Sequence, residues 1–118
     1  YAGANRPLWI IRNGKDTIDE IKATKRSIGG ITEDEQCYHS HEISINKGDT
    51  IYLFSDGYAD LFNGKSSKKL TIKKFKQLLL DIQHMSMKEQ EKHLLDFADA
   101  WRADAEQVDD ILVIGVRF

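Results

Sequence analysis

The stretch Thr50-Ile51-Tyr52-Leu53-Phe54-Ser55-Asp56-Gly57 joins a nearly continuous apolar run to a short polar turn. An apolar run of this length predicts a β-strand that is covered on both faces. The residues before it, 46–49, read Asn-Lys-Gly-Asp and predict a turn. Residues 42–45 alternate in polarity, so they predict a strand that pairs with the apolar run as a hairpin.

Further strands are predicted toward both ends of the chain. Residues 8–11 are apolar and end at Asn13-Gly14, a strong hairpin signal, and residues 17–23 would form the return strand. Residues 111–116 read Ile-Leu-Val-Ile-Gly-Val and predict another buried strand.

Two helices are predicted between the last two strands. Apolar residues recur at helical spacing from Ile72 to Ile82, with Thr71 as the N-cap. A second helix begins at Ser86, because Glu89 three residues later completes a capping box. Its predicted apolar stripe is Leu94, Leu95, Ala98 and Trp101. The pattern indicates an α+β fold, a mostly antiparallel β-sheet or sandwich portion with a packed helical hairpin.

Composition sets the class of protein. The chain has 118 residues, 41% hydrophobic and 31% charged, which is typical of one globular domain. The net charge of −2 predicts neither nucleic acid nor direct membrane contact as a partner. The single cysteine, Cys37, excludes an internal disulfide and suits the cytoplasm.

Acidic residues flank two of the predicted strands. Asp56 and Gly57 follow the 50–54 run, and Asp109 and Asp110 precede the 111–116 run. Carboxylates at strand ends suit Mg²⁺ or Mn²⁺, which are hard cations. Side chains alternate along an extended backbone, so only one of Asp109 and Asp110 would face an ion. The alternative is that Asp-Gly forms an ordinary turn and the Asp pair is solvated.

Two other patterns have competing interpretations. Cys37, His39 and His41 would share one face of a strand and suggest zinc, or their alternation is chance. Lysines at 65, 68, 69, 73, 74 and 76 form a basic segment. We interpret this segment as a solvated loop and first helical turn rather than a phosphate or nucleic-acid site.

Several motifs in a fixed order resemble the PPM superfamily of metal-dependent protein serine/threonine phosphatases, and most closely its SpoIIE-like bacterial branch. They are Tyr1-Ala2-Gly3-Ala4-Asn5-Arg6-Pro7, Ile28-Gly29, Lys47-Gly48-Asp49-Thr50, Phe54-Ser55-Asp56-Gly57 and Gln107-Val108-Asp109-Asp110-Ile111. The resemblance runs along essentially the whole chain.

The resemblance implies a β-sandwich flanked by helix pairs, with two Mn²⁺ or Mg²⁺ ions at one end. In that family a water held between the ions is deprotonated and attacks phosphorus. Asp56 and Asp109 match metal-binding aspartates of the family, with Gly57 and Asp110 in supporting positions.

The family also uses an upstream Asp-Gly pair, whose carboxylate bridges both ions, and an upstream Gly-His-Gly motif. This chain contains no Gly-His or His-Gly pair. We therefore expect residues 1–118 to be the C-terminal part of one phosphatase domain whose upstream half is absent from the chain. Such a part should bind metal weakly, lack activity alone, and expose apolar strand faces that favour a homo-oligomer.

By resemblance, the complete protein would act in bacterial signal transduction. Its substrate would be a phosphorylated signalling protein, such as an anti-sigma-factor antagonist. It would be cytoplasmic, with or without a tether to a membrane sensor. The alternative is a non-catalytic regulatory or dimerisation module of the same fold.

Overall fold

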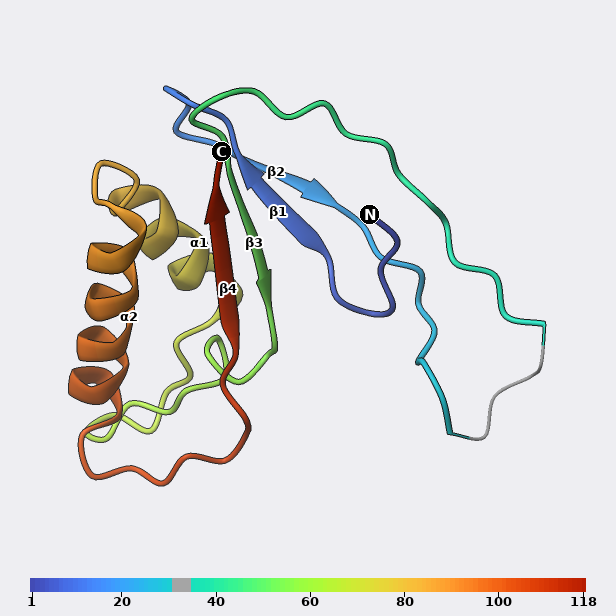
Figure 1. Ribbon diagram of the computed structural model, residues 1–118. Helices are drawn as coiled ribbons and strands as arrows, with labels where there is room; N and C mark the ends of the chain where they lie inside the picture. The colour runs from blue at the N-terminus through green and yellow to red at the C-terminus, as the bar shows by residue number, and fades with distance from the viewer. Residues whose placement is uncertain (31–34) are drawn as a thin grey trace. The chain divides into compact units, whose positions relative to one another are not determined.

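The computed structural model describes residues 1–30 and 35–118. Its elements follow the order β1 (Leu8–Ile11), β2 (Ile18–Ile21), β3 (Thr50–Phe54), α1 (Ile72–Asp81), α2 (Met87–Arg102) and β4 (Val113–Arg117). The strands form one sheet in the order β2-β1-β3-β4 (Figure 1). The α+β class predicted from the sequence is confirmed.

The chain divides into two compact units. The first contains residues 1–53 and 115–118, and the second contains residues 54–114. Strands β3 and β4 therefore each begin in one unit and end in the other.

In the first unit, β1 and β2 form the hairpin that the Asn13-Gly14 signal predicts. They pair antiparallel, with Leu8 opposite Ile21 and Ile11 opposite Ile18. Gly14 has a φ of 72°, a value that favours glycine in a tight turn. All four residues of β1 are buried, so this strand is the centre of the unit's core.

The predicted pairing of residues 42–45 with β3 is wrong, because these residues form no strand. Strand β3 instead pairs antiparallel with β1, with Trp9 opposite Tyr52. The turn before β3 is as predicted, with Gly48 at a φ of 89°. Phe118 lies along the opposite edge at the start of β3. Its carbonyl accepts from the Gly48 N–H, and its N–H donates to the Asp49 carbonyl. Both edges of β3 are thus used by distant segments, and the local hairpin has no free edge to occupy.

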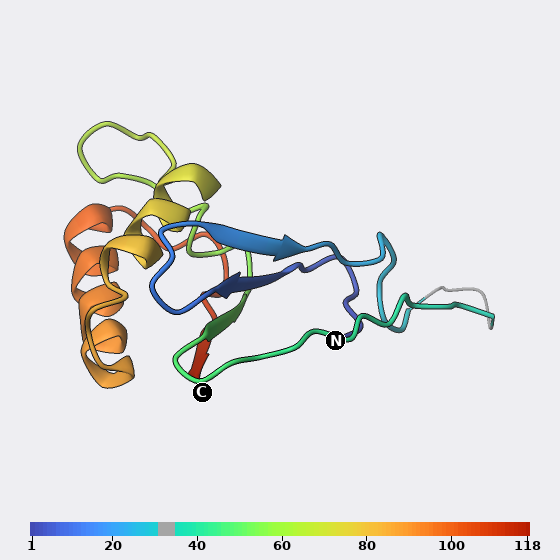
Figure 2. The same cartoon turned by 90° about the horizontal axis from the view of Figure 1, so that it is seen from above.

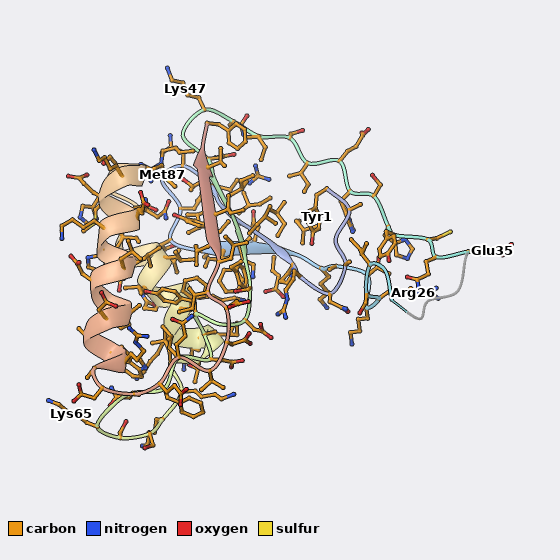
Figure 3. All side chains as sticks on the ribbon, turned by 60° about the horizontal axis from the view of Figure 1, so that its bottom comes forward. Tyr1, Arg26, Glu35, Lys47, Lys65 and Met87 are labelled. Carbon is orange, nitrogen blue, oxygen red and sulfur yellow. The ribbon has the colours of Figure 1, made fainter. Side chains whose placement is uncertain are left out.

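In the second unit, both helices begin where their caps predict. The Thr71 hydroxyl accepts from the Lys74 N–H, and Ser86 and Glu89 form the complete capping box. Figures 1 and 2 both show α1 and α2 side by side, and Figure 3 labels Met87 at the start of α2. Phe75 of α1 meets Phe54 at the end of β3 edge to face, with ring centres 5.4 Å apart.

One predicted core residue of α2 is wrong. Leu95 is 61% exposed, whereas Gln90 and Leu94 are buried. The rest of the predicted stripe faces the core, because Leu94 is buried and Ala98 and Trp101 are half-buried. Within residues 1–30 and 35–118, no helix combines the length and apolar character needed to cross a membrane.

Strand β4 begins at Val113, two residues later than predicted. It lies at the edge of the sheet, and its hydrogen bonds join residue 55 to 112 and residue 49 to 118, so it runs antiparallel to β3. Every second side chain is exposed, which leaves an apolar stripe of Leu112, Ile114, Val116 and Phe118. The exposed apolar strand face expected from the sequence is present.

Candidate metal centre

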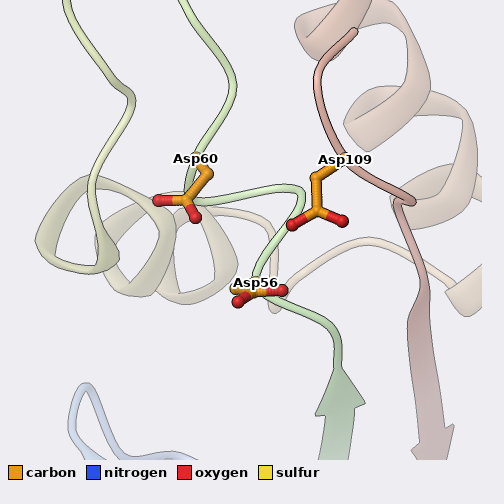
Figure 4. Close-up of side chains that lie close together, drawn as sticks. All are labelled: Asp56, Asp60 and Asp109. Carbon is orange, nitrogen blue, oxygen red and sulfur yellow. The ribbon is translucent and has the colours of Figure 1, made fainter.

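Three aspartates meet in the second unit, where β3 ends and the segment before β4 passes (Figure 4). One carboxylate oxygen from each of Asp56, Asp60 and Asp109 lies within 4.8 Å of the others. Asp56 and Asp60 are half-buried and Asp109 is exposed. The structure thus brings together the two predicted ligand residues and adds a third.

The turn after β3 places Asp56 and Asp60 on one side. The Asp60 N–H donates to the Asp56 carbonyl at 3.0 Å, which closes one helix-like turn. Residues four apart on such a turn face the same way. The residues that point the other way are apolar and almost fully buried: Tyr58, Ala59 and Leu61. Burial of this underside holds the two carboxylates outward.

Two aromatic side chains anchor the turn to α2. The buried Tyr58 hydroxyl donates to the Leu94 carbonyl at 2.7 Å, and the Tyr58 ring stacks on Phe75 at 4.6 Å between centres. Burial raises the pKa of Tyr58, so its hydroxyl stays protonated and keeps donating. The Trp101 indole N–H donates to the Leu61 carbonyl at 3.0 Å. The turn is therefore held rigidly at both ends.

Asp109 lies in a bend and not on a strand. The strand-alternation argument for Asp109 and Asp110 therefore rests on a wrong premise, because β4 begins only at Val113. Another cause separates the Asp110 side chain from the group that Asp109 joins. The Asp110 N–H donates to the Asp109 carboxylate at 2.8 Å, and the exposed Asp110 side chain lies outside the three-aspartate group.

Ser55 and Gly57 join the two segments that carry the aspartates. The Ser55 hydroxyl donates to the Asp110 carbonyl at 2.7 Å and accepts from the Leu112 N–H at 3.0 Å. A Cβ on Gly57 would lie 2.2 Å from the same Asp110 carbonyl oxygen. The φ of Gly57 is not positive, so a glycine is needed here for close approach and not for a sharp turn.

The whole chain matches one protein family. Residues 1–118 match the family described as Stage II sporulation protein E (SpoIIE). The chain belongs to this family. No curated protein matches the chain.

Two solved structures similar to this SpoIIE-family chain are a PP2C domain and a phosphatase domain. The SiaA-PP2C domain of Pseudomonas aeruginosa is 26% identical, with a TM-score of 0.82, over 98% of this chain and 44% of that one. The phosphatase domain of SpoIIE from Bacillus subtilis is 22% identical, with a TM-score of 0.56, over 98% and 47%. This second similarity concerns the fold alone. The chain spans less than half the length of either domain.

Among the motifs of the SpoIIE-family chain, Lys47-Gly48-Asp49 proves to be structural. The buried Asp49 carboxylate accepts from the N–H groups of Asn46 and Asn13, at 3.0 and 2.9 Å, and from the Arg12 guanidinium at 2.8 Å. The two backbone donors and then Arg12 lower the pKa of Asp49 to about 2. A side chain on Gly48 would meet the Asn13 amide at 2.5 Å.

The three aspartates fit a divalent cation. Oxygens on opposite sides of Mg²⁺ are about 4.2 Å apart, since each lies about 2.1 Å from the ion. The three oxygens lie within 4.8 Å of one another, so side-chain rotations that bring them closer together would place them around one ion. An all-carboxylate donor set suits Mg²⁺ or Mn²⁺ better than zinc.

Asp60 is the member of the three-aspartate group that the sequence analysis did not predict. Its signal was the spacing in Asp56-Gly-Tyr-Ala-Asp60, which is one helical turn. The prediction considered carboxylates that directly flank the strands, and Asp60 lies further along the chain.

Cys37, His39 and His41 form no comparable group. They lie in a segment without a named strand, so the shared face on which the zinc interpretation depends is absent. In the part of the chain that the structure describes, ligand atoms gather around one point only at the three aspartates.

Proposed function

We propose that this chain carries part of the active site of a Mn²⁺- or Mg²⁺-dependent phosphoprotein phosphatase. The observation that supports the proposal is the meeting of Asp56, Asp60 and Asp109, from two distant segments, within reach of one ion. Family membership and the similarity to the SiaA-PP2C domain point to the same chemistry.

In this proposal each carboxylate has a defined task. Asp56 and Asp109 ligate the ion, and Asp60 supplies a third oxygen directly or through water. Ser55 and Gly57 keep the two ligand-bearing segments in register, and Asp110 contributes its backbone. When bound, the metal supplies a hydroxide near neutral pH and neutralises phosphate charge. A second ion would take most of its ligands from the segment that corresponds to the unmatched part of the SiaA-PP2C domain.

The substrate we propose is a phosphorylated bacterial signalling protein, of which an anti-sigma-factor antagonist is one example. Carboxylates that are half-buried or exposed suit a phosphorylated side chain on a protein surface better than a small molecule that must be enclosed. The proposed site of action is the cytoplasm, where such substrates are found.

The test is Mn²⁺-dependent hydrolysis of a phosphoserine peptide. We would compare this chain with a protein in which it follows a segment corresponding to the rest of the SiaA-PP2C domain. Asp109→Asn removes a cluster carboxylate, and Asp110→Asn is the matched control because it makes the same change one residue away. We expect turnover from the extended protein, loss of about 100-fold or more with Asp109→Asn, and little change with Asp110→Asn.

A second candidate function is a non-catalytic interaction module. The apolar stripe on the edge strand β4 favours it, since such stripes are typical of association surfaces. Equal activity of the Asp109→Asn and Asp110→Asn proteins, or no activity with either metal, would favour this module over the phosphatase.

A further inference from the structure

The acidic group already has a cation beside it. The Lys69 ammonium lies 3.3 Å from the Asp60 carboxylate, and 5.6 Å from the centre of the Phe62 ring. Asp60 therefore belongs both to the three-aspartate group and to an ion pair within the chain. A divalent ion that used Asp60 would approach the carboxylate that Lys69 already contacts.

The backbone places Lys69 at this point. Residues 59–71 fold back on themselves, with hydrogen bonds from the Leu70 N–H to the Leu61 carbonyl and from the Asn63 N–H to the Lys68 carbonyl. Leu61 and Leu70 are buried at the base of this loop. Because this bridge places Lys69 opposite Phe62, the ammonium lies within reach of Asp60.

Lysine and a divalent ion compete for the negative charge of one carboxylate. An ammonium group only donates hydrogen bonds, so it cannot share in coordinating the ion. Two cations beside the same carboxylate repel each other. We propose that Lys69 competes with the metal for Asp60: it holds this carboxylate when no ion is bound, and its contact weakens when an ion binds.

The size of the effect follows from exposure. The side chains of Lys69 and Asp60 are 50% and 41% exposed. Ion pairs this exposed are weak, so competition by Lys69 should lower Mn²⁺ affinity by about two- to fivefold. The inference rests on the proposed function, because it takes the three aspartates to be the metal site.

The experiment is a titration of the full chain with Mn²⁺, followed by the electron paramagnetic resonance signal of free Mn²⁺. This readout measures binding without activity and also measures weak binding. The variant is Lys69→Met. Lys65→Met is the matched control, because Lys65 lies in the same loop and its side chain points outward from that loop (Figure 3). We expect Lys69→Met to tighten binding about two- to fivefold and Lys65→Met to tighten it distinctly less.

The same titration is repeated in an Asp60→Asn background. If competition occurs at Asp60, Lys69→Met should give no gain there. An equal gain in both backgrounds would overturn the proposal, as would equal effects of Lys69→Met and Lys65→Met, or weaker binding by Lys69→Met.

Two further variants separate this proposal from the proposed function. If Asp56→Asn and Asp109→Asn leave Mn²⁺ binding unchanged, the ion binds elsewhere and both proposals fail. If these variants weaken binding while Lys69→Met has no effect, the metal site stands and only the role of Lys69 is wrong.

Discussion

The Ser55 hydroxyl donates a 2.7 Å hydrogen bond to the carbonyl of Asp110, 55 residues further along the chain. The same hydroxyl accepts from the Leu112 N–H, and the Ser55 N–H donates to the Leu112 carbonyl. One serine thereby fixes the exit of β3 against the segment that leads into β4. Asp56 follows Ser55 directly, and Asp109 directly precedes Asp110. The hydrogen bonds of Ser55, which we call the Ser55 clamp, therefore set the distance between the two predicted ligands.

Ser55→Ala should therefore loosen the metal centre without removing a carboxylate. The change deletes two hydrogen bonds of the hydroxyl, and we expect a loss of about 1 kcal/mol in the free energy of unfolding. Mn²⁺ binding should weaken as well. Urea unfolding and a Mn²⁺ titration would measure both, with Ser66→Ala in the exposed loop as the control. Equal stability and affinity of the Ser55→Ala and Ser66→Ala proteins would show that the clamp is not needed.

Gly57→Ala tests the close approach at the same junction. The new methyl group would lie 2.2 Å from the Asp110 carbonyl oxygen, a distance that requires the backbone to move. We expect destabilisation of about 1–3 kcal/mol, as for overpacked sites, together with weaker Mn²⁺ binding. Gly14→Ala is a useful comparison, because a Cβ at Gly14 meets nothing within 4 Å and only its φ of 72° is unfavourable. Mn²⁺ affinity that falls equally in both variants would contradict a local role for Gly57.

The helix starts and the pairing of β3 show what the sequence can and cannot predict. The capping residues Thr71 and Ser86 marked the helix starts correctly, because a cap acts within one turn of its own helix. The partner of β3 was wrong, because alternation at residues 42–45 does not reveal that β1 and Phe118 already occupy both edges.

The candidate site likewise contains residues that the sequence predicted and one that it did not. Asp56 and Asp109 were found from motifs, and the structure brings them together. Asp60 was missed, because its position depends on the turn that buries Tyr58 and Leu61. Sequence spacing alone does not show which side of such a turn is covered.

Asp49 should give the first unit a pH dependence at acid pH. Its pKa is lowered from 3.8 to about 2, first by the Asn46 and Asn13 N–H groups and then by Arg12. A lowered folded-state pKa means that the stabilisation is present above about pH 4. It is then lost as the pH falls toward 2, because the folded state must take up a proton at an unfavourable site.

We therefore expect Asp49→Asn to lower the melting temperature at pH 7. The difference from wild type should shrink between about pH 4 and pH 2. Asp19→Asn is the matched control, because Asp19 contacts the same Arg12 at 3.4 Å but its side chain is 52% exposed. Circular dichroism melts at several pH values would measure both. A constant difference down to pH 2, or an equal effect of Asp19→Asn, would refute this role for Asp49.

The apolar stripe on β4 predicts self-association of the chain. Leu112, Ile114, Val116 and Phe118 are 41–56% exposed along an edge strand. Edge strands with exposed apolar side chains pair readily with other chains, whereas a lysine on such a strand opposes pairing. Val116→Lys places a charge within the stripe and should shift the chain toward the monomer.

Sedimentation velocity over a range of concentrations would measure this shift. Leu95→Lys is the control, because Leu95 is 61% exposed on α2 and lies outside the stripe. We expect wild type and Leu95→Lys to associate with rising concentration, and Val116→Lys to do so less. If all three proteins sediment alike, the stripe does not drive association. If Val116→Lys alone stays monomeric, the face of β4 is where copies of this chain meet.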